Sequence, residues 1–79
     1  MTKKYYVTSV EFNKVAQAEN RSVPFAFDSL DKAKAKFYTT LANDINNNTI
    51  SDAVVIMFDS NGNKVMSEHW HEEETEVTE

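Results

Sequence analysis

The sequence predicts an α+β domain, with a small antiparallel-rich sheet of three to four strands and one helix packed on one face, in the order strand-strand-helix-strand-strand. Three observations predict it. Apolar residues recur at helical spacing between Leu30 and Ile45, strand-forming residues dominate Lys3–Phe12 and Ala53–Phe58, and a glycine-containing turn, Asp59–Asn63, precedes a last strand. The 79 residues are enough for one domain.

The N-terminal third predicts two strands. Lys3–Phe12 is rich in Tyr, Val, Thr and Phe and contains no Gly or Pro, which is typical of a strand. Asn13–Asn20 is polar and is predicted to be a connection. In Arg21–Asp28 the larger apolar residues alternate with smaller ones, with Val23, Phe25 and Phe27 on one face and Ser22, Pro24 and Ala26 on the other. This predicts a half-buried second strand, and Pro24 places it at a sheet edge because proline cannot donate a ladder hydrogen bond. The alternative is one loop of about 15 residues, which is uncommon in a compact domain.

The middle of the chain predicts the helix. Asp28 or Ser29 is suited to cap its N-terminus, because a short oxygen-bearing side chain accepts an otherwise unpaired backbone N–H. Asn46–Asn48 is expected to end it, since asparagine tolerates the left-handed conformation common after helices. The predicted apolar face comprises Leu30, Ala33, Phe37, Leu41 and Ile45, widened by Tyr38 and Ala42.

The C-terminal part predicts a hairpin followed by an acidic tail. Ala53–Phe58 is a strand with apolar residues on both faces, Asp59–Asn63 is the turn, and Lys64–Trp70 is the returning strand. Residues 72–79 are rich in glutamate and poor in apolar residues, so folding them would not offset the entropy of ordering. The sequence therefore predicts a single domain over residues 1–71 and a disordered acidic tail over residues 72–79.

Charge and composition exclude several functional classes. The net charge is −5, and the whole excess belongs to residues 72–79, so residues 1–71 are neutral. A neutral body lacks the basic surface typical of nucleic-acid-binding proteins, and no direct nucleic-acid binding is expected. The chain has no cysteine, which excludes disulfides and thiol chemistry and fits a reducing compartment.

The sequence predicts a cytoplasmic protein that does not contact a membrane. The N-terminal lysines are followed by alternating residues and not by the apolar run of a signal peptide. The longest apolar stretch, Ala53–Phe58, is far shorter than the roughly 20 residues that a membrane helix needs.

No catalytic, cofactor-binding or metal-binding pattern is recognisable, so we expect neither an enzyme nor a cofactor or metal. No serine lies in a Gly-x-Ser-x-Gly frame, and the single glycine excludes a glycine-rich phosphate loop. His69 and His71 point to one side of a strand, but there is no third histidine to complete a metal site. Asp59–Asn63 alternates oxygen-bearing side chains, yet its glycine is not sixth as a calcium loop of the EF-hand type requires.

The predicted sheet carries more apolar residues than one helix can cover. Both parities of Lys3–Phe12 and of Ala53–Phe58 are apolar, so one set packs under the helix and the other lies on the uncovered face. Such a patch usually marks an interaction surface; the alternative is that strands tolerate half-exposed β-branched and aromatic residues. The residues predicted to bind a partner are Tyr5, Val7, Val55, Met57, Val65 and Trp70. A second choice is the helix surface around Lys32, Lys36 and Tyr38.

Two segments carry a resemblance to known proteins. Phe27–Phe37 (FDSLDKAKAKF) and Val54–Trp70, with its DSNGN turn and EHW ending, resemble small uncharacterised proteins encoded by phages and prophages of Gram-positive bacteria. The resemblance covers most of residues 4–70, and its motifs are structural, so it transfers no functional residue. It implies an accessory protein of a mobile element, a setting in which short acidic cysteine-free domains often resemble inhibitors of bacterial defence, anti-CRISPR proteins among them.

These features together predict a non-enzymatic phage-type protein that inhibits or modulates a host protein, such as a CRISPR-type defence effector, by stoichiometric association in the bacterial cytoplasm. One alternative is a structural or self-assembling component, as a homodimer or a part of the virion. Another is an oligomer that sequesters a small ligand. DNA mimicry is disfavoured, because it needs carboxylates over a folded surface and the body here is neutral.

Overall fold

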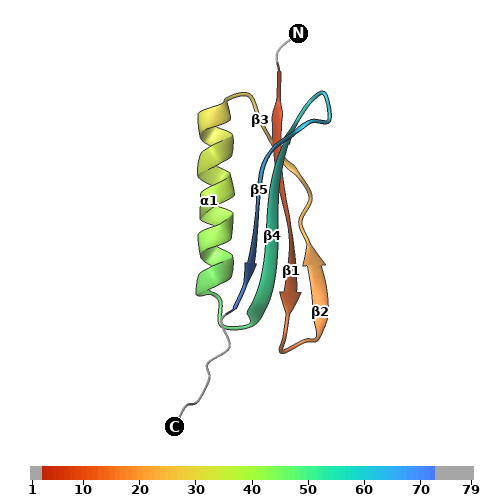
Figure 1. The fold of residues 1–79 in the computed structure, drawn as a ribbon, viewed down its shortest axis with the longest axis vertical. Helices are drawn as coiled ribbons and strands as arrows, with labels where there is room; N and C mark the ends of the chain where they lie inside the picture. The colour runs from red at the N-terminus through yellow and green to blue at the C-terminus, as the bar shows by residue number, and fades with distance from the viewer. Residues whose placement is uncertain (1–2, 73–79) are drawn as a thin grey trace.

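One helix lies along one face of a five-stranded antiparallel sheet in the computed structural model, which describes residues 3–72 (Figure 1). The elements are β1 Tyr5–Asn13, β2 Ala18–Arg21, β3 Phe25–Phe27, α1 Leu30–Asn46, β4 Ile50–Asp59 and β5 Lys64–His71. The sheet order is β2-β1-β4-β5, and β3 also pairs with β1. The predicted α+β class is therefore confirmed. Across residues 3–72 no helix is long and apolar enough to cross a membrane.

The N-terminal edge of the sheet differs from the prediction. Within the predicted strand Arg21–Asp28, only Phe25–Phe27 (β3) and Arg21, the last residue of β2, are in strands, and Ser22–Pro24 lies between them. Pro24 lies in this break because it has no N–H to donate to a ladder. The predicted connection Asn13–Asn20 already contains most of β2, so the described sheet has five strands instead of three to four.

A tight asparagine turn explains why β2 begins so early. Asn13 Oδ1 accepts hydrogen bonds from the backbone N–H of Val15 (3.0 Å) and of Ala16 (2.9 Å). Gln17 then adopts a left-handed conformation with φ of 58°, and the chain reverses into Ala18. Side-chain capping of this kind makes a short turn stable without glycine.

The helix begins where the sequence predicts. Ser29 is the N-cap, and its Oγ accepts a hydrogen bond from the Lys32 N–H (3.4 Å). Asp31 in the first turn suits the positive end of the helix dipole. At the other end the Asn47 N–H donates to the Asp44 carbonyl (3.2 Å).

The buried face of α1 is narrower than predicted, and its last turn buries a different residue. Leu30, Ala33, Phe37 and Leu41 contribute to the core as predicted. Tyr38 and Ile45 are 55% and 44% exposed, Ala42 is also exposed, and Asp44 is buried. At about 100° per residue, position 44 returns to within about 20° of Phe37, whereas position 45 lies about 80° away. Helical geometry thus turns a carboxylate and not an isoleucine toward the sheet.

The core lies between α1 and the odd-numbered residues of β1 and β4. Its buried members are Val7, Ala33, Phe37, Val55 and Met57, with Tyr5, Phe27, Leu30, Leu41 and Met66 packed against them. Val7, Val55 and Met57 are at most 1% exposed, so their predicted place on the partner-binding face is wrong. Both parities of these strands are apolar, and the position of the helix decides which set it covers.

The hairpin between β4 and β5 is a capped turn. Asp59 Oδ1 accepts hydrogen bonds from the backbone N–H of Asn63 (2.9 Å) and of Asn61 (3.0 Å), and Lys3 Nζ lies 3.4 Å from Oδ2. The bond from Asn63, followed by that from Asn61, holds the pKa of the Asp59 carboxyl below its usual range. Gly62 has a φ of 85°, which only glycine adopts without strain.

Replacing Gly62 with alanine is expected to cost about 1 kcal/mol, because a Cβ at positive φ is strained even though the space around it is open. For a domain of this size the melting temperature should fall by roughly 4–8 °C. Asn61→Ala is the control, since Asn61 is exposed and keeps its backbone N–H to Asp59. Equal melting temperatures for the two variants would show that the turn has another, unstrained conformation.

The predicted disordered tail, residues 72–79, lies outside the described residues apart from Glu72. The Glu72 N–H donates to the Ser51 carbonyl (2.8 Å), and its carboxylate forms an ion pair with Lys14 Nζ (2.8 Å). The folded part therefore extends to Glu72, because one backbone hydrogen bond follows the last residue of β5.

Candidate functional site

The sheet face opposite α1 carries two adjacent rows of apolar side chains. These residues, called the open face below, are Tyr6, Val10 and Phe12 of β1 and Val54, Ile56 and Phe58 of β4. The register places Tyr6 opposite Phe58 and Val10 opposite Val54, and the Tyr6 and Phe58 rings stack with centroids 5.3 Å apart. All six are half-buried, and no element of residues 3–72 packs over them.

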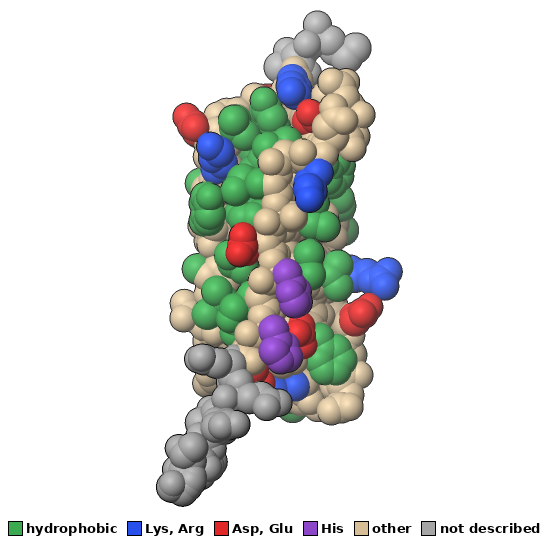
Figure 2. Space-filling model, in the orientation of Figure 1, with side chains coloured by type: hydrophobic (Ala, Val, Ile, Leu, Met, Phe, Trp, Pro, Cys, Tyr) green, Lys and Arg blue, Asp and Glu red, His purple; other side chains and the backbone are tan. Residues whose placement is uncertain are grey.

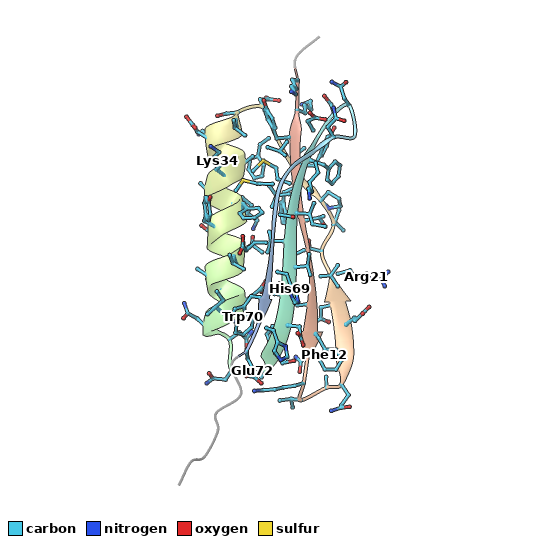
Figure 3. The ribbon with its side chains drawn as sticks, viewed as in Figure 1. Phe12, Arg21, Lys34, His69, Trp70 and Glu72 are labelled. Carbon is cyan, nitrogen blue, oxygen red and sulfur yellow. The ribbon has the colours of Figure 1, made fainter. Side chains whose placement is uncertain are left out.

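Polar side chains border the open face on both sides. Arg21 and Glu19 of β2 face each other in an ion pair (3.1 Å) beyond β1. His69 and His71 lie on β5, and Figure 2 shows the two imidazoles side by side at the surface. Arg21 on β2 and His69 on β5 lie on opposite sides of this face, and Phe12 lies on β1 between them (Figure 3). The border thus carries both signs of charge around an apolar centre.

Among residues 3–72, His69 and His71 are not part of a metal-binding group. His71 Nδ1 contacts Asp52 Oδ1 across the β4–β5 ladder, and this hydrogen bond lowers the pKa of the Asp52 carboxyl. Within residues 3–72 no group of three His, Cys, Asp or Glu side chains is placed to hold a metal ion. His69 and His71 therefore form part of the polar border of the open face.

The remaining predicted partner residues are scattered. Tyr5 packs against the core from the helix side, half-buried. Trp70 pairs with the buried Ala53, so it also lies on the helix side and not at the edge of the open face (Figure 3). Val65 is 39% exposed and sits in the irregularity where the β4–β5 register shifts. The structure therefore does not bring the six predicted residues together on one exposed surface.

A second feature is a polar pocket of about 230 Å3 between α1 and the outer edge of β1. It opens where β1 lacks a full strand partner, because β3 pairs with Tyr5–Val7 and β2 pairs with Val10–Asn13. Between them only Ser22 bridges to β1, with Oγ accepting from the Ser9 N–H (2.9 Å) and the backbone N–H donating to the Ser9 carbonyl (3.0 Å).

Two carboxyl groups line this pocket. Glu11 comes from β1 and has Ser9 Oγ at 3.4 Å, and Asp44 comes from α1 and is 7% exposed. Asp44 Oδ2 receives no hydrogen bond from an N–H or hydroxyl group among the described residues. Burial, followed by a hydrogen bond to the Glu11 carboxyl and by its charge, raises the pKa of Asp44 to about 7. Lys36 Nζ stands over the Phe25 ring, 4.2 Å from its centroid, and both residues line the pocket.

Comparison of the chain with protein-family models, curated proteins and solved structures finds no match. The resemblance to phage-encoded proteins therefore stays a prediction.

Sequence reasoning missed both groupings for identifiable reasons. The open-face residues are even-numbered positions of β1 and β4, whereas the residues predicted to bind a partner on these strands are odd-numbered. Both sets are apolar, so the sequence does not distinguish them. The pocket does have a signal on the helix. Lys36, Thr40, Asn43 and Asp44 are spaced by four, three and one residues, a polar stripe beside the apolar one. Glu11 could not be associated with that stripe without the sheet register.

Proposed function

We propose that the protein is a non-enzymatic binding module that associates with a partner protein through the open face. The observation that carries this proposal is the set of six half-buried apolar side chains on two adjacent central strands, on the face that α1 leaves uncovered. Apolar patches of this kind usually mark interaction surfaces. Tyr6, Phe12 and Phe58 supply the aromatic anchors in which interface energy concentrates.

The border favours a protein as the partner. Arg21 and Lys64 stand with Glu19 and Asp52 around the apolar centre, so neither sign dominates. A nucleic acid or an anionic surface would need a positive border. The resemblance of residues 4–70 to phage-encoded proteins supports a bacterial host protein as the partner, with a defence effector as the specific expectation.

The test is whether association depends on the open face. Ile56→Lys places a charge at its centre, opposite Thr8, and Val54→Thr is a milder change that keeps the β-branched shape. Both should weaken capture of a partner from bacterial lysate by at least about tenfold, since a charge or hydroxyl resists desolvation. Tyr38→Ala is the matched control, because Tyr38 is an exposed aromatic residue on α1.

Circular dichroism and thermal melting accompany each binding measurement, and the captured protein is identified by mass spectrometry. Unchanged capture by well-folded Ile56→Lys and Val54→Thr, with loss in Tyr38→Ala, would move the interface to the helix. A mass of two chains in light scattering, reduced to one by Ile56→Lys, would instead support self-assembly through the same face.

A further inference from the structure

We propose that the pocket between α1 and the edge of β1 binds a cationic amine, an ammonium or guanidinium group, between the carboxyl groups of Glu11 and Asp44. This pocket lies on the helix side of the sheet, so the inference is independent of the open face. The amine belongs either to a small molecule or to a Lys or Arg side chain of a peptide, and the two sources share the same chemistry.

The Asp44 carboxyl is buried and meets no N–H or hydroxyl donor among residues 3–72. Asp44 is 7% exposed and lines the pocket, and its Oδ2 receives no hydrogen bond from an N–H or hydroxyl group of residues 3–72. A hydrogen bond between Asp44 and Glu11 needs a proton shared by the two carboxyls, so loss of that proton leaves both carboxylates without this bond. A buried polar atom left unpaired costs free energy, so such atoms normally have a protein, solvent or ligand partner. Neither Asp44 nor Glu11 forms an ion pair with any Lys, Arg or His of residues 3–72. The pocket thus offers two carboxyl groups that lack a cation.

The other side chains that line the pocket also suit an amine. Ser22, Thr40 and Asn43 add hydroxyl and amide oxygens to the carboxyl groups, which together can accept the several N–H groups of an ammonium or guanidinium. Val7 and Phe25 supply apolar wall for an attached methylene chain. The Phe25 ring already holds a cation over its face, the ammonium of Lys36.

An amine fits better than a metal ion. Divalent cations such as Ca²⁺ are held by six to eight oxygen ligands at about 2.3–2.6 Å, usually with several carboxylates. Residues 3–72 contain no group of three acidic or histidine side chains placed around one point. A space of about 230 Å3 is also far larger than a bare ion and accommodates a short alkylamine.

Binding should strengthen as pH rises through neutrality. The charged groups that line the pocket are Glu11 of β1 and Asp44 and Lys36 of α1, and the wall formed by Ser22 and Phe25 carries none. At low pH the carboxyl pair holds a proton, which competes with the cation. Loss of that proton leaves two negative charges against the single positive charge of Lys36.

The experiment titrates the ¹⁵N-labelled full chain with n-butylamine and, separately, with the peptide acetyl-Ala-Lys-Ala-amide, using n-butanol as the neutral control. At pH 8 we expect both amines to shift the amide signals of Ser9, Glu11, Ser22 and Asp44, while butanol shifts none. Affinity should fall by about tenfold or more at pH 5.5 and in Asp44→Asn, which keeps the shape but removes the charge. Lys36→Met should bind more tightly than the wild type, because it removes the competing ammonium.

The outcomes separate the alternatives. Stronger binding of the peptide than of butylamine assigns the site to a side chain of a partner, and the reverse assigns it to a free amine. A concentration of about 10 mM is high enough to detect the weak binding of small fragments. The proposal would be overturned if neither amine shifted any amide signal at this concentration at pH 8. Equal affinity in folded Asp44→Asn would also overturn it, as would shifts induced by CaCl₂ or MgCl₂ but by neither amine.

Discussion

Phe37→Ala is expected to lower the free energy of unfolding by about 3–5 kcal/mol, the largest effect of any single truncation considered for this protein. Phe37 is 1% exposed and is the largest fully buried side chain, in the middle of the only helix of residues 3–72. Its removal leaves a cavity against Val7, Val55 and Met57, which belong to the same core. Small domains have only a few kcal/mol of stability, so this variant should be largely unfolded near body temperature.

Urea and thermal denaturation followed by circular dichroism measure this loss. Lys34→Ala is the control, because Lys34 is exposed on the same helix (Figure 3) and alanine keeps helix propensity. The control should stay within about 0.5 kcal/mol of the wild type. A stable Phe37→Ala together with an unstable Lys34→Ala would contradict the packing of α1 on the sheet.

Asp44→Asn is expected to stabilise the fold at pH 8 and to have little effect near pH 4. The pKa of Asp44 is raised from 3.8 to about 7 in the folded protein. Between these values the folded chain binds more protons than the unfolded chain, so wild-type stability falls as pH rises from about 4 to about 7 and then levels off. At about 1.4 kcal/mol per pKa unit, the advantage of asparagine should reach on the order of 2–4 kcal/mol at pH 8.

Chemical denaturation at a series of pH values between 4 and 8 measures this difference directly. Glu68→Gln is the control, since Glu68 is an exposed carboxylate on β5 and should change stability by less than about 0.5 kcal/mol throughout. A difference between Asp44→Asn and the wild type that stays constant from pH 4 to pH 8 would show that Asp44 is not the buried acid of the pocket.

The local signals in the sequence predicted most elements correctly. Ser29 caps α1, Asp59 and Gly62 make the β4–β5 turn, and Phe37 anchors the helix on the sheet. The cap and the turn depend on residues only a few positions apart, where side-chain hydrogen bonds and backbone conformation act directly, and the place of Phe37 follows from the helical spacing of apolar residues. The break between β2 and β3 was missed, because the alternation of Arg21–Asp28 continues through Ser22–Pro24 even though these three residues lie in neither strand.

The choice of sheet face required the tertiary structure. β3 and β4 are both antiparallel to β1, on either side of it, so α1 is a crossover between two strands that run in the same direction. Such crossovers are right-handed in nearly all proteins, and their hand determines which face the helix covers once the strand order is known. The strand order arises from long-range pairing, so it cannot be deduced from the pattern of apolar residues in β1 or β4.

The sequence by itself therefore determined the fold class, the helix with its cap, the final hairpin and the surplus of apolar residues in the sheet. Only the tertiary structure decided that Val7, Val55 and Met57 are core while Tyr6, Val54 and Phe58 face outward. It also decided that Asp44 meets Glu11, because helix phase turns one carboxyl inward and the sheet register supplies the other. Periodicity specifies that a strand has two faces, but burial against another element specifies which of them is covered.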